Sequence, residues 1–416
     1  MNRDHATSRV WSLVFMGLLF GNQATAAEPT METRYSEPDK ILVSRDGKIV
    51  SSVPCERIPF KYPEGKSCPS TYNPPRFQMM MARTRDGHLW VADHGELFES
   101  PDEGRTWNYV AQIQQPSTGV IAFTILRDDT MIAATHHVQA HYDEDVFIVR
   151  STDRGRTWQP LATIPRFPFE YVGVDTVCMT ELSNGTILLP MARSNRSWTA
   201  WTHEMWHSPD GGATWGSTPF FSGNESDVLE LKSGKLLATI RRGRYKRYPN
   251  DPPGMAMISQ TNSDHAVEGL GPDAAPKAYK LLSDEEQKRH PGHAYKTILI
   301  ADSDNGGLNW HGLRPVVDKN DVPVLTHDEV HGQLGQLPDG HVVLVHNHRP
   351  VVGDPAGFHE TMMRVSHDEG RTWDRDGYHL ATGHSWPSCL VLADGTIVVH
   401  AGPTVVRFAL PAATAP

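Results

Sequence analysis

The chemistry of this chain is most apparent in one glutamate and one arginine. In the segment GNESDVLELKSGKLLATIR, 223–241, Glu225 lies eight residues before the turn position Ser233 and Arg241 eight residues after it. Strand residues at equal distances from a turn reach the same end of a hairpin, so the two side chains should face each other. A guanidinium binds carboxylates in a bidentate manner and keeps its charge at every working pH. The pair therefore fits either an acidic-substrate site or an ordinary ion pair across the hairpin mouth.

Counting eight residues before and after the turn in five further hairpins brings more polar residues to the end of the fold where Glu225 and Arg241 lie. These polar residues are more numerous than buried strand ends require, so we expect the functional site at this end, although any single one of them could be a solvated edge residue. Histidine suits acid–base work and metal binding, but no His or Cys spacing demands a metal, and neither a metal nor a cofactor is expected. The residues reached by the count or adjacent to it include Gln78, Asp93, His94, Val120, His136, His137, Asp175, Thr176, Ala192, Arg193, His331, His346, Asn347, His348, Arg349, His384, Trp386 and Gly402.

Two alternating sequence phrases make the elements that position these residues. The first is an apolar strand, a turn centred on Asp-Gly or a relative, and a second apolar strand, as in ARTRDGHLWVAD and LVLADGTIVVHA; it occurs six times. The second is Ser-x-Asp-x-Gly-x-Thr-Trp, at 100–107, 151–158, 208–215 and 366–373, with a degenerate copy at 303–310. Its Asp can accept hydrogen bonds from the following backbone, its Gly supplies a positive φ, and its Trp is a large apolar group to bury.

A hairpin followed by an octet hairpin gives four strands, the content of one propeller blade. We therefore predict an all-β fold: a six-bladed β-propeller of four-stranded antiparallel blades, with one octet in each of five blades. It should form a single domain over residues 40–412, with a surface insertion at about 243–292. Residues 40–54 indicate another strand pair, which we expect to close the ring by joining 405–410 beside the sixth hairpin.

The octets resemble the Asp-boxes (BNR repeats) of the sialidase superfamily, and from about residue 40 onward the chain is similar to an exo-α-sialidase-like six-bladed propeller. The resemblance implies that the boxes lie on the outer rim, away from the active site. It also implies that Glu225 is the base to a catalytic tyrosine and that Arg241 is one of three arginines that bind a substrate carboxylate. Arg349 and Arg76 are the candidates for the other two, with Arg57 in CERIPF as the alternative to Arg76.

One position departs from the sialidase pattern. Trp386 stands where the family carries its nucleophilic tyrosine, and indole has no ionisable oxygen with which to attack an anomeric carbon. Either another tyrosine, such as Tyr171 or Tyr142, replaces it, or the chemistry differs and Trp386 is a sugar-stacking platform. The acid–base aspartate is Asp93 or Asp175.

Three functions remain open. The one we favour is a sialidase-like glycoside hydrolase acting on a terminal acidic sugar, with His94 and His136 lining the substrate site. The second is another carbohydrate-active propeller, a uronate-directed glycosidase or lyase that uses a histidine such as His331. The third is a non-catalytic glycan-binding propeller, against which the Glu225–Arg241 pair argues. Three converging arginines would favour the first function, and clustered histidines without a third arginine the second.

Composition and the amino-terminal residues indicate where the protein acts and on what kind of partner. The 416 residues carry a net charge of −10, which does not indicate nucleic-acid binding. Residues 1–27 read as a cleaved signal peptide whose apolar core is too short to span a membrane, so we expect a secreted or periplasmic bacterial protein with acidic glycans as partners. In an oxidising compartment Cys55 and Cys68 could form a disulfide, whereas Cys178 and Cys389 should be buried thiols of inner strands.

Overall fold

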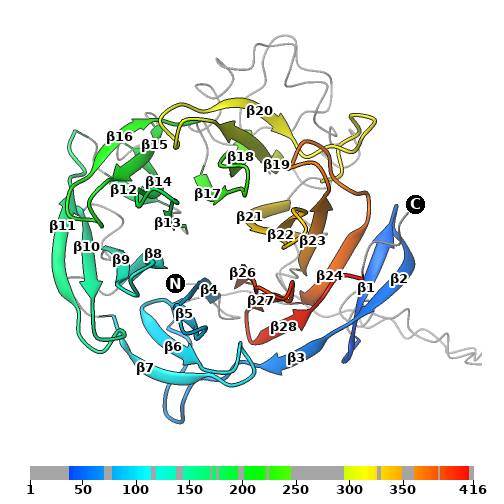
Figure 1. The fold of residues 1–416 in the computed structure, drawn as a ribbon, viewed down its shortest axis with the longest axis horizontal. Helices are drawn as coiled ribbons and strands as arrows, with labels where there is room; N and C mark the ends of the chain where they lie inside the picture. The colour runs from blue at the N-terminus through cyan, green and yellow to red at the C-terminus, as the bar shows by residue number, and fades with distance from the viewer. Residues whose placement is uncertain are drawn as a thin grey trace, which may run out of the picture.

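The hairpin pattern folds into six antiparallel sheets arranged around a central axis. In Figure 1 the innermost strands β4, β8, β13, β17, β21 and β26 surround that axis. The described residues contain strands and turns but no helix, so the all-β six-bladed propeller is confirmed. The structure, a computed structural model, describes residues 37–69, 77–113, 119–136, 144–168, 171–174, 178–194, 201–221, 224–244, 295–325, 329–348, 360–382 and 385–411.

Blades one to three follow chain order from the axis outward. Blade one contains β4 (Phe77–Arg83), β5 (Leu89–Asp93), β6 (Glu96–Ser100) and β7 (Asn108–Gln112). Blade two contains β8 (Gly119–Ile125), β9 (Met131–His136), β10 (Val146–Ser151) and β11 (Gln159–Ile164). In blade three, β12 (Tyr171–Val174) and β13 (Thr180–Glu181) both pair with β14 (Ile187–Ser194), which is followed by β15 (Trp201–Ser208) and β16 (Gly216–Pro219).

Blades four to six repeat the pattern. Blade four contains β17 (Asn224–Glu230), β18 (Leu236–Arg244), β19 (Tyr295–Ser303) and β20 (His311–Pro315). Blade five contains β21 (Glu329–Gln336), β22 (Val342–His348), β23 (Glu360–Ser366) and β24 (Gly377–Thr382). Blade six contains β26 (Ser388–Val391), β27 (Ile397–Ala401) and β28 (Thr404–Phe408). The short β25 (Ser385–Trp386) leaves blade six and pairs in parallel with β4 of blade one.

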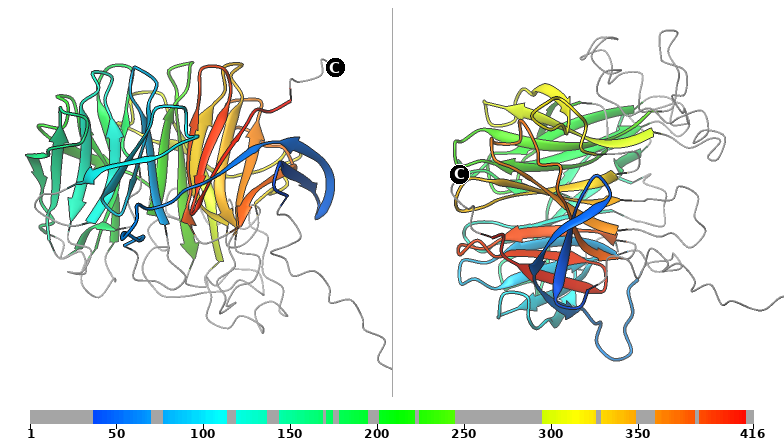
Figure 2. Two further views of the ribbon diagram at one scale, coloured as in Figure 1. Left: turned by 90° about the horizontal axis from the view of Figure 1, so that it is seen from below. Right: turned by 90° about the vertical axis from the view of Figure 1, so that its right-hand side faces the viewer.

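Ring closure differs from the prediction. The segment that pairs with β28 is β3 (Glu56–Pro59), which supplies the fourth strand of blade six. Residues 40–54 instead form β1 (Lys40–Arg45) and β2 (Lys48–Pro54), and β1 pairs with β24 on the outside of blade five. Ile41 and Val43 of β1 are buried in a cluster with Val365 and Leu380, so apolar contact with blade five fixes this position. Figure 2 shows β1–β3 running along the outer side of the ring.

The Asp-boxes form the turns between the third and fourth strands and make the hydrogen bonds expected of their residue types. In the blade-two box, Asp153 accepts hydrogen bonds from the Thr157 amide at 2.9 Å and from the Thr157 hydroxyl at 2.6 Å, and these bonds lower the pKa of Asp153 to about 2. The Ser151 hydroxyl accepts from the Gly155 amide at 2.9 Å, and the Trp158 indole donates to the Gly155 carbonyl at 3.0 Å. The blade-two box therefore closes its turn with hydrogen bonds among its own residues.

The glycine of each box has a second role, at the contact between blades. Gly155 has a φ of +76°, and a Cβ placed there would lie 2.2 Å from a methyl group of Leu97 in blade one. Gly370 of blade five meets Leu237 of blade four in the same way, at 2.6 Å. The boxes thus need glycine both for the turn and for the close approach of the neighbouring blade.

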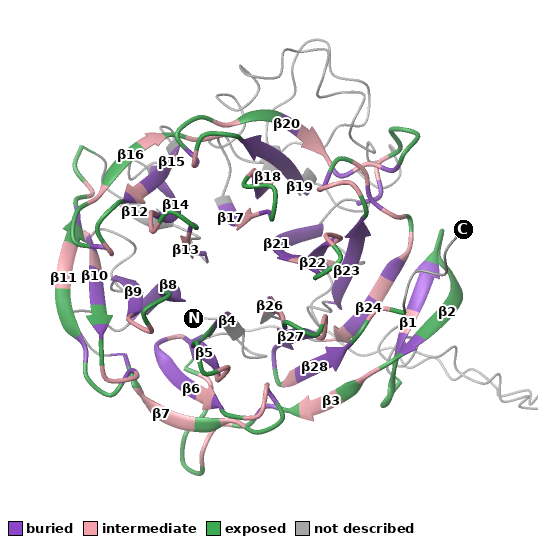
Figure 3. Ribbon diagram, viewed as in Figure 1, coloured by how far each residue is buried: buried purple, intermediate pink, exposed green. Residues whose placement is uncertain are grey.

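The outermost strands are the most exposed, as Figure 3 shows. Every residue of β5 and β9 is buried, whereas the outer strand β7 is exposed at its two ends and half-buried between them. Cys178 and Cys389 are buried thiols, as expected, but Cys55 and Cys68 are not joined by a disulfide. No helix in the described part of the chain is long and apolar enough to cross a membrane. The predicted signal peptide and nearly all of the predicted insertion lie outside the described residues.

Candidate active site at the mouth of the central channel

Glu225 begins the inner strand of blade four on a β-bulge. The register of β17 against β18 shifts between Asn224, which pairs with Arg241, and Ser226, which leaves Glu225 as the extra residue. Its φ of +46° is unusual for a residue that has a Cβ. Nη1 of Arg241 donates to Oε1 of Glu225, and the two side chains are 12% and 1% exposed. The predicted pair is therefore a buried ion pair.

His331 lies on a second bulge, in blade five. The β21–β22 register shifts between Val330 and Gln333, and His331 within this shift has a φ of +57°. Its Nδ1 is 2.9 Å from Oε2 of Glu225, and both side chains are almost fully buried. Two bulges on neighbouring inner strands therefore bring a carboxylate and an imidazole together, and strained backbone of this kind is concentrated at functional sites.

Trp386, in the short strand β25, contacts His331. Its indole Nε1 donates to Nε2 of His331 at 2.5 Å, and the two ring centroids are 5.1 Å apart with the planes tilted by 53°. The position of the indole is set by β25, which pairs Trp386 with Gln78 of β4. The indole ring is only partly buried, which leaves part of it accessible for a ligand to stack on.

Arg241, Glu225, His331 and Trp386 form a continuous series of contacts, which we call the mouth chain. An indole nitrogen can only donate, so Nε2 of His331 must accept, and the ring proton is on Nδ1, the nitrogen 2.9 Å from Glu225. Glu225 in turn forms an ion pair with Arg241. A carboxylate that orients an imidazole is a common device for proton transfer.

Four predicted site residues thus come together, whereas Asp93 and His136 make other contacts in the described part of the chain. Asp93 is fully buried at the end of β5; Tyr62 donates to its Oδ2 at 2.5 Å, and Nε2 of His94 is 3.7 Å from its Oδ1. These partners belong to blade one and the 60–69 segment rather than to the mouth chain. His136 is buried at the end of β9, opposite Gly119. The predicted residues Asp175, Arg76 and Arg349, and the tyrosine alternative Tyr142, lie outside the described residues.

Tyr62 was missed by sequence reasoning. Burial, and then the Asp93 carboxylate, raise the pKa of its hydroxyl, so it remains a protonated donor. It lies in an irregular segment after β3 that carries no periodic signal. Arg57, the alternative to Arg76, lies in β3 and donates to the backbone carbonyls of Glu37, Lys40 and Leu380, which is a structural role at the outside of the ring.

A second row of polar side chains crosses blade five, at the end of the blade where His331 lies. The strand pairing aligns Glu329, His348 and Glu360, and Nδ1 of His348 is 3.8 Å from Glu360. Burial acts to lower the pKa of His348, but Glu360 and Glu329 raise it overall. His379 contacts Glu360 through Nδ1 and the Ser44 hydroxyl through Nε2, at 2.8 Å. Because Ser44 belongs to β1, this row fastens the added strands to the blade.

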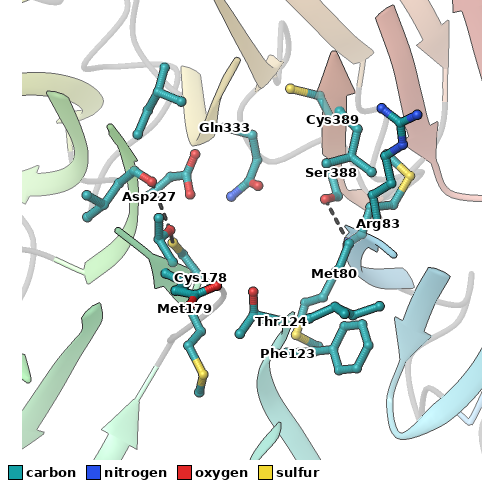
Figure 4. A pocket seen from close by; sticks show the side chains of 18 of the residues that line it. Met80, Arg83, Phe123, Thr124, Cys178, Met179, Asp227, Gln333, Ser388 and Cys389 are labelled. Atoms are coloured by element: carbon teal, nitrogen blue, oxygen red, sulfur yellow. Dashed lines mark hydrogen bonds between the residues drawn. The ribbon is translucent and has the colours of Figure 1, made fainter. Parts of the chain in front are cut away.

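The central channel itself contains a cavity of about 340 Å³, deeper than the mouth chain. Figure 4 shows Asp227, Cys178, Gln333 and Ser388 from different blades around it. Burial raises the pKa of Asp227 to about 6, against hydrogen bonds from Cys178 and from the Leu334 amide. Sequence reasoning missed Asp227, although its place two residues after Glu225 on an inner strand could have indicated that it faces the channel.

Comparison with known proteins supports the fold. No protein-family model and no curated protein matches the sequence. A Dyadobacter fermentans protein of unknown function is similar in structure, with 16% identity over 88% of this chain and 99% of that chain and a TM-score of 0.52. A Penicillium chrysogenum α-L-arabinanase, solved with arabinobiose, has 13% identity over 84% and 96% and a TM-score of 0.52.

A Hadza microbial sialidase is also similar, with 15% identity, 80% of this chain and 64% of that chain covered, and a TM-score of 0.49. That score is too low to support an argument about this chain. Identities this low relate the three proteins to the chain by fold alone. The six-bladed propeller resembles those of glycoside hydrolases, and the site must be argued from its own residues.

Proposed function

We propose that this protein is an exported glycoside hydrolase that acts on a terminal acidic sugar of a glycan, sialic acid or a related sugar. The observation that supports this proposal is the mouth chain. Glycosidases act through carboxyl groups beside the scissile bond, and Glu225 is a carboxylate held on strained backbone next to a cation, a histidine and an aromatic ring.

The ion pair suggests how an acidic sugar would activate the site. Without substrate, Arg241 is bound to Glu225. The carboxylate of an entering sugar competes for the same guanidinium, with Arg76 and Arg349 as further binding candidates. Release from Arg241 leaves the Glu225 carboxylate able to accept a proton at the moment when substrate is bound. The substrate charge therefore takes part in catalysis as well as in binding.

The reaction that follows is hydrolysis by direct attack of water. Glu225 takes a proton from the water molecule, whose oxygen bonds to the anomeric carbon while the bond to the leaving group breaks. The leaving oxygen takes a proton from a general acid, for which Asp175 is the candidate. The Trp386 ring stacks against the sugar. Direct attack needs no tyrosine nucleophile, which agrees with tryptophan at that position.

The Glu225–His331 contact favours a second candidate, a uronate lyase. In that reaction the Trp386 indole first turns away from Nε2 of His331, which then takes the proton from C5 of a uronate. The C4–O bond breaks, and the leaving oxygen takes a proton from solvent. A double bond then joins C4 and C5. Glu225 would stabilise the imidazolium, and Arg241 would neutralise the uronate carboxylate as the proton leaves.

The test is release of 4-methylumbelliferone from its sialic-acid glycoside by the purified mature protein. Glu225→Gln and Arg241→Ala are each expected to lower kcat/KM roughly 100-fold or more, while Arg45→Ala, which breaks an exposed ion pair with Asp376, leaves it unchanged. The α-L-arabinofuranoside is the neutral comparison, because a protein of similar fold was solved with arabinobiose.

The outcomes separate the candidates. Turnover of the sialoside alone supports the proposed function. Turnover of the neutral arabinofuranoside at an equal rate would contradict substrate activation through Arg241. If a folded protein releases nothing from either glycoside but generates ultraviolet absorbance from a uronate polysaccharide, the lyase is the function. Glycan binding without any product would show that the propeller is not an enzyme.

A further inference from the structure

The side chains of Cys68, Asp93 and His94 gather at the turn between β5 and β6 of blade one. Sγ of Cys68 is 3.7 Å from Oδ2 of Asp93, and Nε2 of His94 is 3.7 Å from Oδ1 of the same carboxylate. One ligand atom from each residue lies within 4.8 Å of the other two. Asp93 is fully buried, whereas Cys68 and His94 are partly exposed, so the group lies just below the surface.

These distances fit the edges of a zinc coordination tetrahedron. Zinc bonds of about 2.0 Å to carboxylate oxygen, 2.1 Å to imidazole nitrogen and 2.3 Å to thiolate sulfur place neighbouring ligand atoms about 3.3–3.6 Å apart. The two 3.7 Å contacts use different oxygens of Asp93, and a set with one atom from each residue lies within 4.8 Å, so side-chain movements of up to about 1 Å would bring the three atoms to these edges. Sulfur, nitrogen and carboxylate oxygen are also the donors that zinc prefers in proteins, whereas calcium and magnesium prefer oxygen alone.

The surroundings hold two of the three groups in place. The Tyr62 hydroxyl donates to Asp93 at 2.5 Å, which is the kind of outer hydrogen bond that orients a ligating carboxylate. The Tyr62 ring packs edge-on against Phe98, with centroids 5.1 Å apart. His94 has a φ of +48° in the tight turn between β5 and β6. Lys66 pairs with Glu96 at 3.1 Å, which fixes the segment that carries Cys68.

We propose that Cys68, Asp93 and His94 form a zinc site that fastens the 60–69 segment to blade one. The segment directly follows β3, the strand that closes the ring, so a metal here would brace the closure from the side of blade one. Zinc binds the thiolate, and the thiol proton leaves to solvent. A water molecule completes the tetrahedron. The role is structural and does not depend on the proposed hydrolase.

The first experiment measures zinc in protein purified without a metal-affinity tag. We expect about one zinc ion per chain, and a lower Tm after removal by a chelator that zinc restores. Cobalt(II) added to the metal-free protein should give a thiolate-to-cobalt charge-transfer band and the visible bands of a tetrahedral site. Wild-type protein that takes up neither zinc nor cobalt at this stoichiometry, with a Tm unaffected by chelator, would overturn the proposal.

The variants assign the ligands. Cys68→Ser and His94→Gln should lose most of the zinc and the effect of chelator on Tm, and Cys68→Ser should also lose the charge-transfer band. Cys55→Ser removes the other cysteine near the amino end and should retain all three signals. Zinc content unchanged in both ligand variants, or a Cys55–Cys68 disulfide in the purified protein, would refute the site. If a ligand variant does not fold, the cobalt spectra of wild type and Cys55→Ser still decide whether a thiolate of Cys68 binds the metal.

Discussion

The indole N–H of Trp386 donates to Nε2 of His331 at 2.5 Å, which fixes which nitrogen of the imidazole carries its proton. The other nitrogen, Nδ1, lies 2.9 Å from Glu225. A proton on Nε2 would place two donors against each other, so the indole favours the tautomer with the proton on Nδ1. A residue that cannot attack a sugar can thus still set the proton state of its neighbour.

Trp386→Phe is the test of this relationship, because phenylalanine keeps an aromatic ring and removes the donor. In the wild type, nitrogen NMR at neutral pH should report the Nδ1–H tautomer of His331. In the variant, Nε2 has lost its donor, so the Nε2–H tautomer should appear beside it. Equal tautomer populations in the two proteins would contradict the hydrogen bond.

The buried Glu225–Arg241 pair predicts a strong coupling in stability. Arg241→Met leaves a buried carboxylate without its cation and should lower the free energy of unfolding by about 3–5 kcal/mol. The double variant Glu225→Gln/Arg241→Met should cost less than the sum of the single changes, with a coupling of about 1–3 kcal/mol. Urea unfolding of the four proteins measures the cycle.

The matched control is Arg45→Met, which removes the exposed partner of Asp376 and should change stability little. If Arg241→Met were as mild as this control, the mouth pair would be solvated rather than buried.

Gly332 follows His331 in the blade-five bulge and has no room for a side chain. A Cβ there would lie 3.0 Å from methyl groups of Leu344 and Thr239 and 3.1 Å from Ile298. Gly332→Ala should therefore cost about 1–3 kcal/mol in urea unfolding and displace His331 from Glu225. Gly216→Ala is the control, because a Cβ at Gly216 has no atom within 4 Å. Equal stability of the two variants would show that the bulge is loosely packed.

Because the side chain of His400 is buried, we expect the propeller to lose stability in mild acid. Burial lowers the pKa of His400 to about 3, and its ring packs edge-on against Phe60 with centroids 4.3 Å apart. Below about pH 6.5 the unfolded chain binds a proton that the folded chain refuses until about pH 3, so stability falls as pH falls through this range. The loss from this residue is about 2 kcal/mol at pH 5.

His400→Phe should remove that loss, which denaturant unfolding at pH 8 and pH 5 can measure. At pH 8 both forms of the protein have a neutral side chain here, so their difference reports packing alone. An equal fall in stability between pH 8 and pH 5 in the variant and the wild type would exclude His400 as a source of acid sensitivity.

The blades could be predicted from sequence because their signals are local. The Ser151 and Asp153 side chains satisfy the turn of their own box, so the octet pattern defines the same hairpin wherever it occurs. The position of residues 40–54 is not local. Ile41 and Val43 would suit the apolar edge of more than one blade, and only the assembled ring determines that β24 receives them. Alternation alone cannot choose between edges.

The candidate site, like the fold, could be predicted only in part from the sequence. Counting from the turn brought Glu225 and Arg241 to one end, but the structure pairs Asn224 with Arg241 and sets Glu225 on a bulge. A bulge adds a residue that regular counting does not contain, and the contact of Glu225 with His331 depends on two of them. The partners of Asp93 could not be predicted, since Tyr62 reaches it from an irregular segment.

The pairing of β3 with β28 has a consequence for how the protein is made. A ribosome produces Glu56–Pro59 long before Thr404–Phe408, yet each is the other's neighbour. The early strand must therefore wait, with its backbone amides and carbonyls unmatched, until the chain as far as Phe408 has been translated. Premature termination before Thr404 would leave blade six without the strand that β3 pairs with, and an otherwise intact product would remain an open ring.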